Sequence, residues 1–567
     1  MFDGVVLNDP FGGWVQWNRV VPIDIETVEV VRGGASSLYG DSSLSGAVNV
    51  RPREIENKYL LSADVFGGSQ KTLSGAAFAG FKTAGWTGDL AASNFQTKGY
   101  KPVDEAVRGP ADVFAGVRSS SVSPKVTREF GKRASIFFRP SYFGEVRTNG
   151  TGLQTNRTHI RQAITGGYLK LDPDSNVKID WRIYGGTQVF DQISSTVNTA
   201  RTSETISRVQ RVPVQSVGAS VQISGVYRHQ TFLGGVETRN VRGSSDEIGF
   251  TNGVSSSLAG SGGRQNTTGV FFQDFAQMGK RLVISGSVRL DRWRNYGALT
   301  TTRTLSTNVQ TTIKFTDRNE QAVSPQISML FHVSEQFSVY ANASRSFRAP
   351  TLNELYRSFR VGNVLTQANE NLLAEHAKNV EGGVSFARKR SFVRAGGFWA
   401  EVDNPVSNVT LSSTASLITR QRQNAGSTRS SGIELEAETS FREFTFSAGY
   451  MFVNPIVSSF PNNRALEGLL IPQIARNQFT FQGRYGWGKW TAAMQGRSSS
   501  GQFDDDQNLF RLEPYTQIDL FFSRRLTEKL QIYAAVENVF NSRYSVAKTP
   551  IRSVSSSVNF RVGFRWN

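Results

Sequence analysis

The chain has 567 residues, no cysteine and a formal net charge of +18 at pH 7. The absence of cysteine excludes a disulfide framework and any metal site built from thiolates. No apolar run approaches the roughly 18 residues that a membrane-spanning helix requires, so a helical membrane protein is excluded as well.

The first predicted element lies between Ile25 and Val50, where two short β-runs flank a segment rich in glycine and serine. Arg32 and Gly33 end the first run, and the second run follows Gly46. Glycine adopts backbone conformations that are closed to other residues, so its positions here indicate tight turns and close backbone approach. The stretch predicts a compact two-stranded element, although on its own it would be an ordinary loop.

After residue 57 the sequence becomes a long series of short alternating stretches. The clearest is the last, in which Phe560, Val562 and Phe564 alternate with polar residues or glycine. Successive side chains of a strand point to opposite faces, so this pattern gives each strand one apolar and one polar face. A face that carries charged residues along its length must meet water, while the opposite face meets an apolar medium.

The connections between these stretches alternate in length. About ten short turns and about eleven mostly long polar loops predict about 22 antiparallel strands, which is the pattern of an outer-membrane barrel. Closure also removes the exposed edges that so many strands would present. The long loops are expected at 293–320, 346–376, 403–430, 452–474 and 498–514.

Soluble all-β folds are the alternatives to this barrel. A propeller would show a blade repeat of roughly 40–50 residues, which is absent, and serial sandwiches would need linkers and two-sided cores. We therefore predict an all-β membrane protein with a closed transmembrane barrel. Aromatic residues near the strand ends predict girdles at the two membrane interfaces: Trp86, Trp181, Tyr340, Trp399, Tyr450, Trp487, Trp490, Tyr533 and Trp566.

The positive charge has two interpretations: solvated faces and turns, or a surface or cavity that attracts anions. Nucleic acid is not expected as a partner, because the basic residues are scattered rather than clustered on one element. No GxSxG or HExxH motif is present, and the four histidines (His159, His229, His332 and His376) lack the spacing of metal ligands. We expect no enzymatic activity, no cofactor and no bound metal. The run Asp504–Asp506 in a predicted outer loop fits either a solvated turn or oxygen ligands for Ca²⁺.

Several motifs together resemble a known family. The stretches 3–14 and 25–50 are similar to the second half of the plug domain of TonB-dependent outer-membrane receptors. Three further segments of this chain are similar to the barrel signatures of that family: Ser344–Thr351, Gly432–Glu436 and Val536–Tyr544. The order and spacing of these motifs cover essentially the whole chain.

The resemblance implies a fold and a location. Residues 1–56 would form part of a plug, and residues 57–567 a barrel of about 22 strands that encloses it. The protein would be a monomer that crosses the outer membrane of a Gram-negative-type bacterium many times, in contact with its lipid and lipopolysaccharide. The family's first plug half and its TonB-coupling segment precede the matched region, so the coupling segment is expected to be absent from this chain.

The resemblance also implies a function: TonB-dependent active import of a scarce solute, such as a ferric siderophore, another ferric chelate or cobalamin. A passive pore and a surface adhesin are the alternatives. The plug motif would comprise Val30, Arg32, Gly33, Tyr39, Gly40 and Gly46. A lock between plug and barrel would join Arg32 to Glu381 and Glu434, which the strand register places on the lumenal face. Ligand contacts are expected at Phe11, Trp14, Ser37 and Tyr39.

Overall fold

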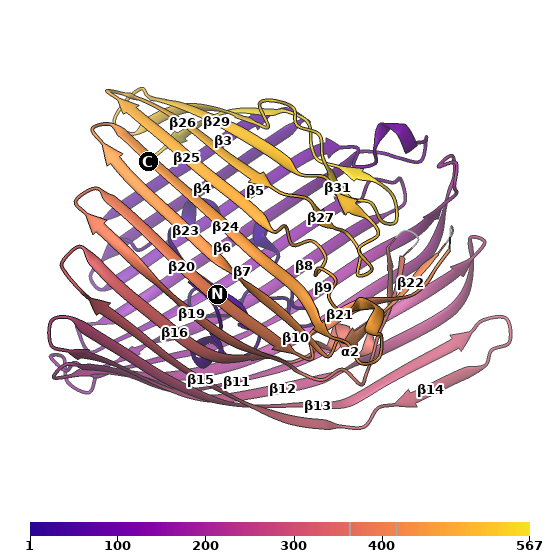
Figure 1. Cartoon of the computed structure of the whole chain (residues 1–567), viewed down its shortest axis with the longest axis horizontal. Coiled ribbons are helices and arrows are strands. Elements are labelled where there is room, and N and C mark those ends of the chain that lie inside the picture. The colour runs from indigo at the N-terminus through magenta and orange to yellow at the C-terminus, as the bar shows by residue number, and fades with distance from the viewer. Residues whose placement is uncertain (362–363, 415–416) are drawn as a thin grey trace.

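The computed structural model describes residues 1–361, 364–414 and 417–567. Its main element is a closed antiparallel barrel of 22 strands (Figure 1). The chain closes on itself, because the first barrel strand pairs with the last along Ala63–Gly68 and Arg561–Trp566. The barrel strands are β3 (Tyr59–Gly68), β4 (Thr72–Thr83), β5 (Trp86–Tyr100), β6 (Ala115–Phe130), β7 (Ala134–Thr148), β8 (Thr155–Leu169), β9 (Lys178–Val197), β10 (Glu204–Tyr227), β11 (Gln230–Thr251), β12 (Val254–Met278), β13 (Leu282–Thr304), β15 (Arg318–His332), β16 (Phe337–Arg348), β19 (Glu375–Arg388), β20 (Ser391–Asp403), β23 (Ser427–Phe441), β24 (Phe444–Ser459), β25 (Asn477–Trp487), β26 (Trp490–Ser499), β29 (Tyr515–Arg525), β30 (Leu530–Glu537) and β33 (Asn559–Trp566).

The predicted faces of the strands are confirmed. Phe560, Val562 and Phe564 are exposed on the outer surface, as are Val380 and Ile433. An outer surface of this kind suits a lipid environment, in which a closed barrel satisfies every backbone hydrogen bond between strands.

The prediction of a membrane-interface girdle is wrong for two residues, Tyr533 and Tyr340. Tyr533 is buried and donates a hydrogen bond to Asp64 at 2.7 Å. Tyr340 lines a lumenal cavity, where its hydroxyl accepts a hydrogen bond from Arg394 at 3.0 Å. Both rings point into the lumen, because polar partners there satisfy their hydroxyl groups.

The predicted loop at 293–320 is largely strand. β13 continues to Thr304, and β14 (Gln310–Lys314) pairs with its last residues. This hairpin projects beyond the barrel wall (Figure 1). A strand surrounded by water needs no apolar face, so the alternation stops there while the backbone pairing continues.

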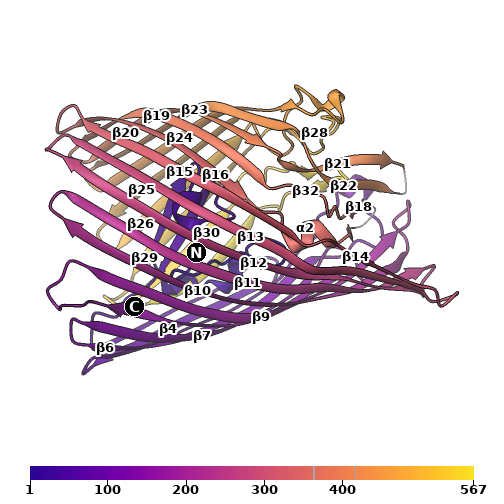
Figure 2. The ribbon, with the colours of Figure 1, turned by 90° about the horizontal axis from the view of Figure 1, so that it is seen from below.

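The N-terminal residues lie inside the barrel (Figures 1 and 2). This plug contains a two-stranded antiparallel sheet, in which Arg32 pairs with Gly46. A β-carbon at Gly46 would lie 2.5 Å from the carbonyl oxygen of Val31, so only glycine fits this turn. Its elements are η1 (Trp17–Arg19), η2 (Pro22–Asp24), β1 (Ile25–Arg32), α1 (Ser36–Tyr39) and β2 (Gly46–Pro52).

The connections at the end of the barrel opposite the short turns fold into a cap. A four-stranded sheet joins two of them in the order β17-β18-β22-β21. Next to it α2 packs on the plug through a buried cluster of Phe11, Leu352, Leu355, Tyr356 and Leu372. None of the helices in the described residues is long and apolar enough to cross a membrane. The elements of these connections are η3 (Glu105–Val107), α2 (Leu352–Tyr356), β17 (Phe359–Val361), β18 (Val364–Gln367), β21 (Val406–Ser413), β22 (Ile418–Asn424), η4 (Arg464–Leu466), β27 (Gln502–Phe503), β28 (Arg511–Leu512), β31 (Ser545–Ala547) and β32 (Ser553–Val554).

The two faces of the wall should respond differently to charge. We expect Val562→Arg to lower the free energy of unfolding in lipid vesicles by up to about 2–4 kcal/mol, because it places a cation against hydrocarbon. The control is Ser74→Arg, which places the same side chain in a lumenal cavity. Denaturant titration of the refolded barrel measures both changes, and equal losses would contradict the assigned faces.

Candidate functional site

The candidate site is the contact between the plug and the barrel wall. The segment that follows β1 docks on the end of β16 and the residues after it. The Phe347 amide donates to the Ser36 hydroxyl at 3.2 Å, and the Ala349 amide donates to Asp41 Oδ1 at 2.9 Å. The Ser346 hydroxyl donates to the Leu44 carbonyl at 2.7 Å. The barrel signature Ser344–Thr351 therefore holds the glycine-rich turn of the plug.

Arg32 forms two ion pairs with β23. Its Nη1 lies 2.8 Å from Glu434 Oε2, and its Nη2 contacts Glu436. The predicted partner Glu381 is not bridged; it accepts a hydrogen bond from Asn342 at 3.4 Å. Glu434 and Glu436 are two residues apart on one strand, so both point into the lumen and a single guanidinium reaches both.

These ion pairs are well hydrated. The side chains of Arg32, Glu434 and Glu436 are 48%, 35% and 31% exposed. They border a lumenal cavity of about 580 Å³, which separates β1 and β2 from the wall. Exposed ion pairs contribute about 0–1 kcal/mol to stability. Of the predicted lock, the pair between Arg32 and Glu434 is therefore present but hydrated, and the bridge from Arg32 to Glu381 was predicted wrongly.

A second group of charges between plug and wall is largely shielded from water. The Nη1 of Arg139 in β7 lies 3.2 Å from Asp24 Oδ2, and its Nε lies 3.4 Å from Asp3 Oδ2; both carboxylates belong to the plug. The Nη2 of Arg139 lies 3.8 Å from Oδ1 of Asp89 in β5. Lys125 of β6 lies 2.9 Å from Asp3. The side chains of Arg139 and Asp24 are each only 1% exposed. We call these five residues the Arg139 cluster.

The Arg139 cluster contains three carboxylates and two cations. Burial raises the pKa of Asp24 to about 6, against the attraction of Arg139, and nearby Asp89 raises it further. Burial alone would raise the pKa of Asp3 as well, but Lys125 and Arg139 together outweigh this effect and lower it. Asp24 is therefore the plug carboxylate of this cluster that takes up a proton most readily.

A third contact lies at the tip of the plug turn. Arg289 of β13 is fully buried, and its Nη1 donates to the Leu38 carbonyl at 3.5 Å. Its charge is balanced by Asp291 at 2.8 Å and by Glu237. Gly40 has a φ of +67°, and a β-carbon there would lie 2.7 Å from Arg289. The glycine predicted as part of the plug motif is thus required by both backbone and contact.

Two of the four predicted ligand contacts are inaccessible. Phe11 is buried beneath α2, and Ser37 is buried and donates to Gln326 at 2.6 Å. Trp14 and Tyr39 are partly exposed. Phe11 was placed wrongly because its cover comes from the loop after β16, more than 300 residues away in the chain.

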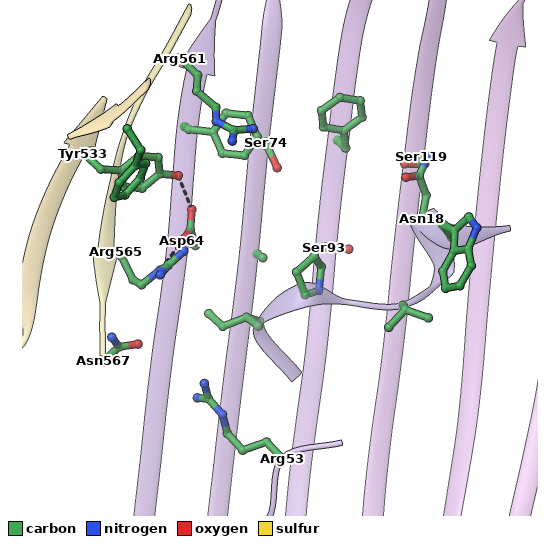
Figure 3. A pocket seen from close by; sticks show the side chains of 18 residues that line it. Asn18, Arg53, Asp64, Ser74, Ser93, Ser119, Tyr533, Arg561, Arg565 and Asn567 are labelled. Carbon is green, nitrogen blue, oxygen red and sulfur yellow. Dashed lines mark hydrogen bonds and ion pairs between the residues drawn. The ribbon is translucent and has the colours of Figure 1, made fainter. Parts of the chain in front are cut away.

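A lumenal cavity of about 600 Å³ lies on another side of the plug (Figure 3). Plug residues Asn18 and Arg53 face wall strands β3 to β6 across it, and Asp64 joins Tyr533 and Arg565 at one end. Phe521, which interrupts the alternation of β29, lines this cavity. Plug and wall are thus separated by open space on more than one side.

The run Asp504–Asp506 joins loops together. The carboxylate of Asp504 accepts from the Lys548 and Thr549 amides at 2.8 Å, and that of Asp506 accepts from Thr410. Asp504 and Asp505 are buried, so the solvated-turn interpretation was wrong. In the described part of the chain, no group of three or more His, Cys, Asp or Glu side chains is placed to hold a metal ion.

Comparisons with known proteins agree with this architecture. The profile described as "TonB dependent receptor-like, beta-barrel" matches residues 79–539, and the "TonB-dependent Receptor Plug Domain" matches residues 1–47. The chain is 20% identical over 556 residues to the vitamin B12 transporter BtuB of Photobacterium profundum, covering 97% of this chain and 81% of that protein.

Solved structures show the same fold. The ferric yersiniabactin uptake receptor FyuA from Yersinia pestis superposes with a TM-score of 0.78 at 15% identity, over 96% of this chain and 85% of that one. The copper transporter OprC superposes with a TM-score of 0.79 at 14% identity, over 95% and 86%. With a family match over most of its length, an N-terminal plug segment and a 22-stranded barrel, the chain belongs to the TonB-dependent receptors.

Proposed function

We propose that this receptor actively imports a scarce solute, such as a ferric chelate or cobalamin, across the outer membrane of a Gram-negative bacterium, powered through TonB. The observation that carries the proposal is a plug held inside the barrel by charged and polar contacts, with cavities beside it. A gate that must move needs contacts that water can replace, and polar contacts meet that need better than a continuous apolar core would. The names of the relatives, which include vitamin B12, ferric yersiniabactin and copper transporters, support import.

The contacts between plug and wall differ in strength. The half-exposed pairs of Arg32 stabilise docking by about 0–1 kcal/mol. In a buried ion pair, removal of one partner typically costs about 3–5 kcal/mol, because the remaining charge is left without compensation. The Arg139 cluster therefore acts as the main lock in this proposal, and the Arg32 pairs act as a secondary, water-accessible contact.

The test of import uses the bacterium that carries the gene. We expect deletion of the gene to reduce uptake of one labelled solute, among ferric chelates and cobalamin, under limitation for that solute. Restoration of the gene should recover uptake, and a protonophore should abolish it, because TonB draws on the proton-motive force. Uptake that persists with the protonophore would indicate a passive pore, and unchanged uptake of every solute after deletion would indicate a recognition protein.

Removal of Arg139 and removal of Arg32 should destabilise plug docking to different extents at about neutral pH. We expect Arg139→Gln to lower the stability of plug docking by about 3–5 kcal/mol, since three carboxylates remain with one lysine. Arg32→Gln should cost about 1 kcal/mol or less. Protease cleavage of the plug segment along a urea titration measures both variants in the same assay. Equal costs would contradict the assignment of the main lock to Arg139.

Docking should also depend on pH through Asp24. Its folded pKa of about 6 lies above the unfolded value of 3.8, so the docked plug binds a proton more tightly than the released plug. This contribution to docking is complete below the unfolded pKa and is lost as the pH rises through about 6. The same cleavage assay at acidic and neutral pH should show weaker docking at neutral pH. Asp24→Asn should remove the difference, and a difference that persists in this variant would assign it to another group.

A further inference from the structure

Four neighbouring strands of the wall are long enough to extend well past the membrane. Strands β10, β11, β12 and β13 have 24, 22, 25 and 23 residues. A tilted strand crosses the hydrocarbon of a membrane in about 9–11 residues. More than half of each of these strands therefore lies outside the hydrocarbon, and they extend toward the loop end of the barrel, beside β14 (Figure 1).

The outward face of these strands changes from apolar to basic along their length. One row across β11, β12 and β13 consists of Val236, Val270 and Leu290, which are all exposed. Every second residue from this row toward the loops also faces outward. These outward positions include four exposed arginines, which we call the outer arginine patch: Arg242, Arg264, Arg292 and Arg294.

Two members of the outer arginine patch lie directly opposite each other. Arg242 of β11 and Arg264 of β12 form a cross-strand pair. Neither guanidinium forms a hydrogen bond or an ion pair with any residue that the structure describes. Like charges that face each other on adjacent strands destabilise a sheet. A bound anion would remove this repulsion.

The other two members have partners within the chain. Nη2 of Arg294 lies 2.7 Å from Asp317 Oδ2, which offsets its charge. Nε of Arg292 donates to Asn319 Oδ1 at 2.8 Å, but a neutral acceptor does not cancel a charge. Among the described residues, the patch thus has one carboxylate in ion-pair contact with its four guanidinium groups.

Other charges on the outward face are balanced. In the next charged row toward the loops, residues of opposite sign alternate across β8, β9, β10 and β11: Arg157, Asp191, Arg211 and Asp246. On β19 and β20, Nζ of Lys378 lies 3.0 Å from Asp403 Oδ2 and 3.8 Å from Glu401 Oε1. Arg429 of β23 lies opposite Glu401. An unbalanced positive charge is therefore a property of the patch and not of every basic site on the outer surface.

We propose that the outer arginine patch binds the phosphate groups of lipopolysaccharide in the outer leaflet. The patch faces the leaflet and not the lumen, and it begins directly beyond the apolar row, where the headgroups of the lipid lie. Guanidinium groups bind phosphate through paired, charge-assisted hydrogen bonds. Tyr296, whose ring centroid lies 5.1 Å from the Arg294 guanidinium, is of a residue type that favours this interfacial depth. The inference does not depend on import.

Native mass spectrometry of the purified full chain in detergent measures this binding. The probe is lipid A, the phosphorylated anchor of lipopolysaccharide, in EDTA so that no divalent cation bridges protein and lipid. We expect saturable binding of lipid A and at least tenfold weaker binding of dephosphorylated lipid A. Inorganic phosphate at equal concentration should not displace the lipid, because it lacks the acyl chains that pack beside the apolar row.

Variants locate the binding. We expect Arg264→Gln to weaken the apparent affinity about tenfold, the effect of losing a charge-assisted hydrogen bond, and the double change with Arg242→Gln to weaken it further. Arg429→Gln, which changes an outward arginine on another part of the wall, is the matched control and should bind as the parent does.

Stability without lipid gives a second measurement. In lipid-free detergent, Arg264→Gln should leave the thermal unfolding midpoint unchanged or raise it, because it removes a repulsion between like charges. Circular dichroism measures the midpoint and shows that the variant folds. A lower midpoint would show that the chain itself uses this charge, which would contradict the proposal.

Four outcomes of the binding experiment would overturn the proposal. Equal affinity in the parent and both patch variants would place the lipid elsewhere. Equal binding of dephosphorylated lipid A would show that only the acyl chains are recognised, and displacement by inorganic phosphate would assign the patch to a soluble anion. A dimer mass that forms without lipid and is lost in the variants would assign the patch to contact between copies of this chain. None of these outcomes bears on import, which the uptake experiment tests separately.

Discussion

The structure depends on the need to satisfy every backbone hydrogen bond of a chain surrounded by lipid. Closure of β3 on β33 meets this need, because no strand edge remains to face the hydrocarbon. Closure in turn fixes which side chains face inward, since alternate residues of every strand point to the lumen. The wall therefore carries an internal polar surface, and any occupant of the lumen must match it with polar or charged groups. The plug does so at Arg32, at the Arg139 cluster and at Arg289.

Burial decides how much each of these contacts matters. The Arg32 pairs have good geometry but remain hydrated, so water and salt compete with them. Arg139 and Asp24 are shielded from water, so a charge left there without its partner is costly. Burial, with a smaller contribution from Asp89, explains why the pKa of Asp24 rises although a guanidinium lies beside it. The ion pairs of Arg32 are thus weaker contacts between plug and wall than the Arg139 cluster.

Much of this arrangement could be predicted from the sequence because strand periodicity is local. The alternation around Phe560 sets the outer face, and the same rule places Glu434 and Arg139 in the lumen. The rule also places Glu436 beside Glu434, although it did not enter the predicted lock. What local periodicity cannot supply is the partner of a lumenal charge, which depends on how the plug sits. Strand periodicity also gives no signal beyond the membrane, where the β13–β14 hairpin lacks an apolar face. Nor does it predict the burial of Phe11, which is covered by residues distant in the chain.

The packing of α2 on Phe11 links the outer loops to the plug. The Asn353 amide also donates to the Phe11 carbonyl at 2.9 Å, so α2 is joined to the plug apex by both backbone and side chains. The side-chain oxygen of Asn353 and its carbonyl accept from Arg357 and Arg422 respectively. A shift of either arginine would therefore displace Asn353, the residue that joins α2 to the plug apex. The outer loops and the plug apex are thus joined by one short set of contacts through α2.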